Sequence, residues 1–248
     1  TTVTNSSPCN QIDSVSWGGR PSRLSFVCTL IERDNFMKIV ILGATGFVGR
    51  NVLKQALEAS HEVTVLVRDA RKLGSDNSKL KVIEGDARKY QDVKKAITGQ
   101  DVVIQTLGLG GQGYGKPNDT VSQATRILVD IMSQEKRGYL VCVSNAGVGS
   151  SENFGPWWMR KLIPLFFKWL VHIQNDKRIM EQTLINSDIK WSIIRCPKIL
   201  DKNAKQCYRT SKDGKGIGYS ISVVDVARFL LSEGTSQNYL HQPIAISN

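Results

Sequence analysis

Several signatures of common site types are absent from this 248-residue chain. Its five cysteines include no C-x-x-C pair, and its three histidines are scattered without the spacing of metal ligands. No apolar run reaches the length needed to cross a bilayer, and no helix-turn-helix, zinc-finger or aromatic RNA-binding signature occurs. The sequence therefore predicts neither a metal site nor a transmembrane segment, and it disfavours nucleic acid as a partner.

Acidic residues are also scarce relative to basic ones, which gives a formal net charge of +11. Such a charge favours anionic partners, and a phosphorylated cofactor is one candidate. Cys142 and Cys196 lie inside apolar runs, as is typical of unreactive core cysteines in a reduced, intracellular protein. We therefore expect a cytoplasmic protein, or one of an organelle interior if the first residues are a targeting remnant.

The chain divides at Met37. Residues 1–36 are rich in Ser and Thr and lack sustained periodicity, so we expect a disordered or targeting-like extension. From residue 37 to residue 248, short apolar runs alternate with helical patterns. Predicted strands are 38–42, 62–67, 80–83, 101–104, 139–143 and 191–195, and residues 240–247 could close the sheet. This alternation predicts an α/β fold of the Rossmann type, doubly wound, with a mostly parallel sheet, helices on both faces, and the substrate region in its C-terminal third.

A glycine-rich turn follows the first of these strands and opens a helix. Gly43 permits a sharp turn, Gly46 permits close approach of a pyrophosphate, and Gly49 permits the helix to pack closely on the sheet. The helix amino end then offers N–H groups and a partial positive charge to phosphate. We therefore predict a dinucleotide site in the following seven residues: Gly43, Ala44, Thr45, Gly46, Phe47, Val48 and Gly49.

The end of the second strand indicates which dinucleotide is bound. NAD enzymes place an acid there for the ribose 2′-hydroxyl, whereas this chain has Arg68, with Arg71 and Lys72 close by. A guanidinium can pair with a 2′-phosphate, so the sequence favours NADP(H) over NAD(H). Asp69 is the alternative, because a shift of one position would restore the acid.

These motifs together resemble the atypical short-chain dehydrogenase/reductase superfamily, in particular its biliverdin-IXβ reductase (flavin reductase)-like and NmrA-like members. The resemblance runs from Met37 to about Ser247. It depends on the glycine turn and on six further segments, namely Val67-Arg-Asp69, Glu84-Gly-Asp-Ala87, Asp101-Val-Val-Ile104, Val143-Ser-Asn145, Arg195-Cys-Pro197 and Val224-Asp-Val-Ala227.

The resemblance implies further site residues. Asp86 would contact the adenine with Ala87 beside it, and Leu107 and Gly108 would border the nicotinamide-side ribose. Ser144 occupies the position of the family's active-site serine. These positions follow strand ends, where ligands of open α/β sheets bind.

One departure from the superfamily affects catalysis. Members carry a Tyr-x-x-x-Lys pair, but here Ile173 stands in the tyrosine position and only Lys177 remains, which could instead hold ribose hydroxyls. Without that general acid, we expect an acceptor that takes hydride readily and draws its proton from solvent, such as a flavin, quinone, bilin or enone. The rival hypothesis is a non-catalytic NADP(H) sensor or regulatory or assembly protein of the NmrA-like type.

An aromatic, basic segment lies between residues 157 and 171. It is either a substrate lid that uses Trp157, Trp158 and Phe166, a membrane-surface helix, a partner-binding patch, or a helix whose apolar face is core. The sequence leaves these readings open and predicts no oligomeric state.

Overall fold

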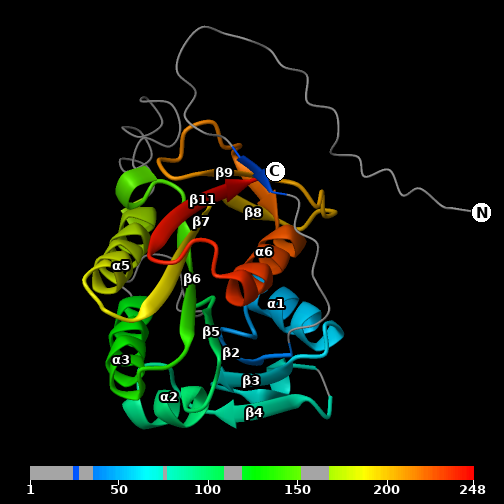
Figure 1. The fold of residues 1–248 in the computed structure, drawn as a ribbon, viewed down its shortest axis with the longest axis vertical. Coiled ribbons are helices and arrows are strands. Elements are labelled where there is room, and N and C mark those ends of the chain that lie inside the picture. The colour runs from blue at the N-terminus through cyan, green and yellow to red at the C-terminus, as the bar shows by residue number, and fades with distance from the viewer. Residues whose placement is uncertain (1–24, 28–35, 75–76, 109–118, 152–167) are drawn as a thin grey trace, which may run out of the picture.

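A nine-stranded sheet forms the centre of the protein, with helices on both of its faces (Figure 1). The structure is a computed structural model that describes residues 25–27, 36–74, 77–108, 119–151 and 168–248. The predicted fold class, a Rossmann-type doubly wound sheet, is confirmed.

Seven strands form the parallel part of the sheet. In spatial order they are β4 (Leu80–Glu84), β3 (Glu62–Val67), β2 (Lys38–Leu42), β5 (Val102–Gln105), β6 (Tyr139–Asn145), β7 (Lys190–Cys196) and β11 (Gln242–Ser247). Apart from β4 at the end of the sheet, their apolar runs lack the alternation of a half-exposed strand, because both faces of the sheet are covered.

Two antiparallel strands continue the sheet beyond β11, so β11 is an internal strand. These are β9 (Tyr208–Ser211), which pairs with β11, and β1 (Ser25–Val27), which pairs with β9. β1 lies within the segment for which the sequence predicts an extension. Residues 1–24 and 28–35 lie outside the described residues. Two short strands, β8 (Lys198–Leu200) and β10 (Ser220–Ser222), form a separate parallel pair.

Five described helices cover the sheet. On one face lie α1 (Phe47–Glu58) and α6 (Val223–Ser236), which pack against each other. On the other face lie α2 (Tyr90–Ile97), α3 (Thr120–Glu135) and α5 (Lys168–Ile185) (Figure 1). Each face encloses its own cluster of buried apolar side chains, so the sheet separates two cores.

Helix starts show where local sequence rules hold. The sequence Ser222-Val-Val-Asp225 has the spacing of a capping box at the start of α6. The Ser222 hydroxyl does cap α6, and it accepts a hydrogen bond from Val224 N. Asp225 does not complete that box, because its carboxylate accepts from the backbone N–H groups of Lys205 and Gln206. At α3, in contrast to α6, the cap is not local, since Asp176 of α5 accepts from the first-turn N–H groups at distances of 3.0 and 3.1 Å.

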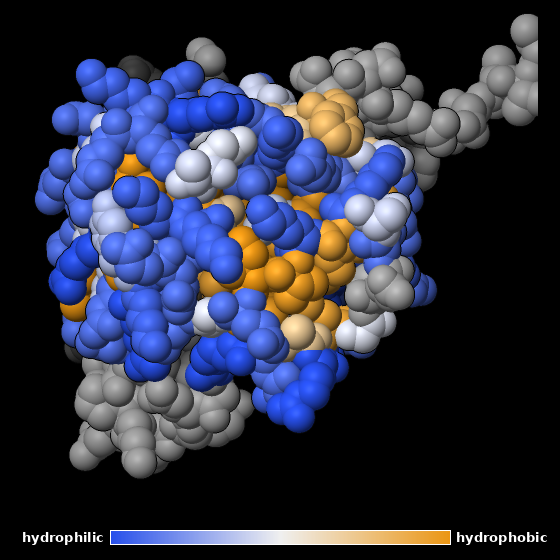
Figure 2. Space-filling view, turned by 90° about the horizontal axis from the view of Figure 1, so that it is seen from below, coloured by the Kyte–Doolittle hydropathy of each residue, from blue (hydrophilic) through white to orange (hydrophobic). Residues whose placement is uncertain are grey.

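The strand β4 ends the sheet on the side away from β1. Figure 2 shows this end of the molecule from below, where hydrophilic side chains surround an apolar patch. Val82 on β4 is 39% exposed, which makes it one of the few large apolar side chains that face solvent among the described residues.

The chain reverses its winding direction at β2. From β2 it runs outward through β3 and β4, and it returns through α2 to β5 on the other side of β2. The register pairs Leu42 with both Leu66 and Gln105, so the turns after β2, β3 and β5 meet at one edge of the sheet. Ligands of open α/β sheets bind at such a switch point.

Candidate dinucleotide site

The glycine turn between β2 and α1 is sterically closed to side chains at two positions. Gly43 has a φ of +91°, and a Cβ there would lie 3.0 Å from the carbonyl carbon of Thr106. A Cβ on Gly49 would lie 2.1 Å from the Gly43 carbonyl oxygen. The turn is held by Gly46 N, which donates to the Gly43 carbonyl at 2.9 Å. The glycines therefore bring β2, β5 and the start of α1 together more closely than any side chain would allow.

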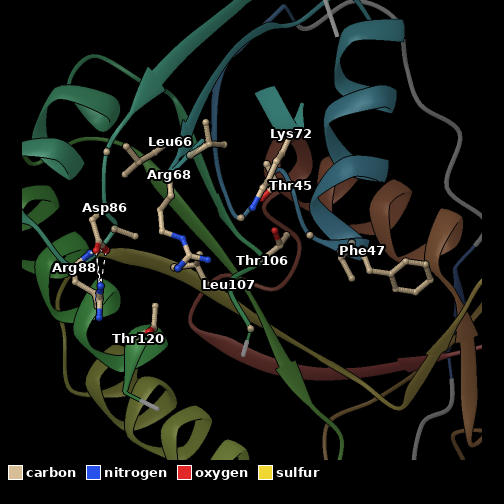
Figure 3. Close-up of a pocket in the computed structure, with 17 residues that line it drawn as sticks. Thr45, Phe47, Leu66, Arg68, Lys72, Asp86, Arg88, Thr106, Leu107 and Thr120 are labelled. Atoms are coloured by element: carbon tan, nitrogen blue, oxygen red, sulfur yellow. Dashed lines mark hydrogen bonds and ion pairs between the residues drawn. The ribbon is translucent and has the colours of Figure 1, made fainter. Parts of the chain in front are cut away.

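A cavity of about 500 Å³ opens beside this turn (Figure 3). Ten of the twelve residues predicted to bind the cofactor line it, namely Gly43, Thr45, Gly46, Phe47, Val48, Arg68, Asp86, Ala87, Leu107 and Gly108. Ala44 and Gly49 do not. Ala44 is fully buried in the apolar core, and Gly49 packs against the turn itself. The structure thus gathers the predicted residues from four strand ends around one cavity.

Seven further residues line the cavity without having been predicted as cofactor ligands: Leu66, Val67, Lys72, Gly85, Arg88, Thr106 and Thr120. Thr106 directly follows β5, and its hydroxyl donates to the carbonyl of Leu42 at 3.0 Å. Its place immediately after a strand is a signal that sequence reasoning could have used. Arg88 carried no comparable signal, because its place depends on how the turn after β4 folds.

Basic side chains dominate the polar wall of the cavity. Arg68, Lys72 and Arg88 line it, against the single carboxylate of Asp86. Figure 3 shows Arg68 and Lys72 entering from the β3 side and Arg88 from the turn after β4. The balance favours an anionic group in this part of the cavity.

The alternative acid, Asp69, is directed into its own turn. Its carboxylate accepts hydrogen bonds from the backbone N–H and the guanidinium of Arg71, at 2.9 to 3.2 Å. The Asp69 carboxylate thereby caps the short 3₁₀ helix η1 (Ala70–Lys72). The hydrogen bond with the Arg71 side chain lowers the pKa of Asp69. Asp69 does not line the cavity, whereas Arg68 does.

Asp86 is paired within the cavity wall. Its carboxylate forms an ion pair of 2.6 Å with the guanidinium of Arg88. Hydrogen bonding by Arg88, with a smaller contribution from the charge of Arg68, lowers the pKa of Asp86 to about 2. The carboxylate is therefore ionised throughout the neutral range.

Lys177 of α5 supports the cavity wall at Leu107 through hydrogen bonds to the main chain. Its Nζ donates to the carbonyl of Leu107 at 3.0 Å and to that of Val143 at 2.6 Å, which joins the ends of β5 and β6. The side chain is 4% exposed, and burial lowers its pKa. Leu107 lines the cavity, so Lys177 acts on the cavity wall through the main chain.

Ser144 belongs to a buried ionic network next to Val143, which accepts a hydrogen bond from Lys177. Its hydroxyl donates to Glu181 Oε1 at 2.6 Å, and the same carboxylate pairs with Arg195 at 2.6 Å. Both charged side chains are at most 3% exposed. Arg195 also donates to the hydroxyl of Ser150, and a Cβ on Gly149 would lie 2.3 Å from its guanidinium. The network fixes the end of β6 against β7.

The two predicted catalytic residues therefore lie near each other, but both are engaged with protein groups. Neither Ser144 nor Lys177 lines the described cavity. The side chain of Ile173 is not described, and the predicted lid residues Trp157, Trp158 and Phe166 lie outside the described residues.

Within the described ranges, no group of three or more His, Cys, Asp or Glu side chains is arranged to hold a metal ion. None of the described helices combines the length and the apolar character needed to cross a membrane.

Comparison with protein families identifies the class of this site. A family profile described as "NAD(P)H-binding" matches residues 43–235, which includes the glycine turn and most of the described fold. The chain belongs to this NAD(P)H-binding family. The match begins at Gly43, the first residue of the turn that the geometry singles out.

Relatives by sequence include uncharacterised proteins and several named reductases. YwnB of Bacillus subtilis is 26% identical over 79% of this chain and 92% of its own length. Phenylcoumaran benzylic ether reductase Pyrc5 of Pyrus communis is 36% identical over 29% of this chain and 27% of its own length. Uncharacterised protein 052L of Frog virus 3 is 31% identical, but the match spans only 31% of its length. Apart from YwnB, the chain thus matches about a third or less of these relatives.

Solved structures of the same fold cover more of the chain. ChuY, described as an anaerobilin reductase from Escherichia coli O157:H7, superposes with a TM-score of 0.68 at 20% identity, over 85% of this chain and 96% of its own. A short-chain dehydrogenase/reductase from Veillonella parvula, in complex with NADP, gives 0.72 at 18% identity, over 86% of this chain and 95% of its own. The family profile confirms the predicted NAD(P)H-binding family, and these structures share the predicted Rossmann-type fold.

Proposed function

We propose that this protein is an NADPH-dependent reductase of a small, planar acceptor. The observation that carries the proposal is the cavity beside the glycine turn, where three cationic side chains meet one paired carboxylate. NADPH carries one more phosphate than NADH, at the ribose 2′ position. An excess of positive charge at this point favours the phosphorylated form.

The residues present fit a dinucleotide phosphate. A Cβ at Gly43 or Gly49 would collide with backbone atoms, so the turn keeps its tight shape. Phe47 and Val48 of the first turn of α1 line the cavity, and the first N–H groups of a helix have no partner within the helix. Those N–H groups would hold the pyrophosphate, and Arg68 with Lys72 would pair with the 2′-phosphate. Leu107 and Gly108 would border the nicotinamide, which when bound supplies a hydride.

The described side chains also restrict the acceptor. The Ser144 hydroxyl donates to Glu181, and the Lys177 ammonium donates to two backbone carbonyls. Among the described residues, neither predicted catalytic group is thus directed at the cavity as a proton donor. Reduction of a flavin or a quinone consumes one hydride and one proton, and solvent water supplies that proton without a positioned acid. Simple ketones depend more strongly on such an acid, which contributes ~10²- to 10⁴-fold.

The names of related proteins agree with this class of acceptor. ChuY is described as an anaerobilin reductase, and sequence relatives are named phenylcoumaran benzylic ether reductase and isoflavone reductase homologue. These names describe reductions of conjugated or aromatic molecules. They support a flat, delocalised acceptor for this chain.

The test is steady-state oxidation of NADPH with a panel of FMN, a soluble quinone, biliverdin and a conjugated enone. We expect turnover with at least one acceptor, and a clear preference for NADPH over NADH. Arg68→Ala should weaken NADPH binding by about tenfold or more and leave NADH nearly unchanged, because one charge-assisted pair is worth about 1.5–3 kcal/mol. Binding of NADPH without turnover of any acceptor would contradict the reductase.

That last outcome would favour the second candidate, a non-catalytic NADP(H) sensor. The engagement of Ser144 and Lys177 with protein groups is the observation that supports it. A sensor should respond to the nucleotide by a change in its affinity for another protein. Comparison of hydrogen exchange with NADP⁺, with NADPH and without nucleotide would identify the surface concerned.

A further inference from the structure

In the turn after β4, Arg88 lines the cavity and is held in place by several hydrogen bonds to Asp86. Arg88 Nε lies 3.1 and 3.2 Å from the two oxygens of Asp86, and its Nη2 lies 2.6 Å from Oδ2. The backbone N–H of Arg88 also donates to Asp86 at 2.9 Å. Asp86 therefore holds both the backbone N–H of Arg88 and one edge of its guanidinium, and Arg88 lines the cavity.

Helix α2 holds this turn in place through Asp92. Asp86 N donates to Asp92 Oδ2 at 2.9 Å, and a Cβ on Gly85 would lie 2.8 Å from the Asp92 side chain. Gly85 thus permits a contact that no other residue would permit, and that contact fixes the position of Asp86. Because Asp86 holds Arg88, the rigidity of α2 extends to the guanidinium.

The fork with Asp86 does not use all of the arginine's hydrogen-bonding capacity. A guanidinium has five N–H donors, and Asp86 takes donors from Nε and Nη2 only. The Arg88 side chain is 39% exposed, so the remaining donors can reach a ligand. An arginine that is already ordered loses little further conformational entropy when it binds an anion.

We propose that Arg88, held by Asp86, is a specificity-determining residue that binds the cofactor's 2′-phosphate together with Arg68. In this arrangement Asp86 is a positioning residue for Arg88. The inference rests on the proposed preference for NADPH, and it adds a residue from the turn after β4 to a recognition set that the sequence places after β3. Arg88 then contributes charge where the phosphate lies, and no contact to the rest of the dinucleotide is required of it.

Two small probes isolate this contact from turnover. 2′,5′-ADP carries the 2′-phosphate, and 5′-ADP lacks it while it keeps the adenosine. Isothermal titration of both probes would be carried out on the wild-type chain, Arg88→Met, Arg88→Lys and the control Arg71→Met. Arg71 is a suitable control because its side chain is 90% exposed, it is paired with Asp69, and it does not line the cavity.

We expect Arg88→Met to weaken 2′,5′-ADP by at least tenfold, or about 1.4 kcal/mol, and 5′-ADP by less than twofold. Arg88→Lys should recover part of the loss, since it keeps the charge but not the fork, and Arg71→Met should resemble the wild type. The selectivity of the wild type should also fall more steeply with added salt than that of Arg88→Met.

Two results overturn the inference. If Arg88→Met weakens both probes equally, Arg88 only maintains the turn. If the wild type prefers 2′,5′-ADP and Arg88→Met keeps the same preference, the 2′-phosphate is recognised without Arg88, and the proposed function stands. A wild type with no preference between the probes contradicts the NADPH preference itself.

Discussion

Substitution of Gly49 by alanine tests the steric argument for the glycine turn. The added methyl group would lie 2.1 Å from the carbonyl oxygen of Gly43 and 2.7 Å from its carbonyl carbon. Both distances are far inside the ~3.5 Å at which carbon atoms make favourable non-bonded contact. Neither atom belongs to a flexible side chain, and the Gly43 carbonyl already accepts from Gly46 N. Relief therefore requires α1 to move away from the turn.

Overpacking of a closed site costs ~1–3 kcal/mol, and the two backbone clashes place Gly49→Ala at the upper end, about 2–3 kcal/mol. For a domain of this size, ~2–4 °C per kcal/mol gives a fall in Tm of about 5–10 °C. Displacement of α1 also moves the N–H groups that would hold the pyrophosphate. We expect NADPH affinity to fall at least tenfold.

The assay is thermal unfolding followed by calorimetric titration of NADPH at a temperature where both proteins are folded. Gly218→Ala is a matched control, because its methyl group would lie 3.5 Å from Ser247 Oγ, an ordinary contact, and Gly218 does not line the cavity. A Gly49→Ala protein with the melting temperature and the NADPH affinity of Gly218→Ala would refute the reasoning.

Three further predictions concern the buried and paired charges. Glu181→Gln leaves Arg195 buried without its anion, so the free energy of unfolding in urea should fall by about 3–5 kcal/mol, and a Glu181→Gln/Arg195→Met double variant should lose less than the sum of the single losses. Lys177→Met leaves the carbonyls of Leu107 and Val143 without their donor, so NADPH affinity should fall about tenfold. Lys177→Arg should recover part of that affinity. Unchanged affinity in Lys177→Met would show that these two hydrogen bonds do not shape the cavity. The pKa of Asp86 is lowered to about 2 in the fold, so its stabilisation is complete above about pH 4 and is lost as pH falls towards 2. Asp86→Asn should therefore be less stable than the wild type at pH 7, by about 1 kcal/mol, with the difference shrinking near pH 3; a constant difference would contradict the assignment.

The part of the fold that could be predicted from the sequence is the part set by local pattern. The apolar runs at 38–42 and 101–104 and the helix periods between them determine a parallel sheet almost uniquely, because crossovers of that length have one hand. β1, β8, β9 and β10 were not predicted, since strands of three or four residues carry little pattern and their partners are distant in sequence. The pairing of β9 with β11, which makes β11 internal, depends on that missing information.

The site residues also divide into those that local sequence pattern predicts and those that tertiary packing places. The glycine turn and Arg68 were predicted because each follows a strand end directly, and Arg68 and five of the seven turn residues line the cavity. The pairing of Arg88 with Asp86, the two carbonyls bound by Lys177 and the capping of α3 by Asp176 were not predicted. Each of these joins a side chain to a group whose position is set by tertiary packing. The engagement of Ser144 with Glu181 belongs to the same class, and it changes what the serine can do.

The central claim is that the turn at Gly43–Gly49 and the adjacent basic wall form a seat for a phosphorylated pyridine dinucleotide. Calorimetric titration of the purified chain with NADPH, and then with NADH, tests it most directly. The account predicts one saturable site with NADPH bound at least tenfold more tightly than NADH. Absence of binding heat and of thermal stabilisation with both nucleotides would contradict it.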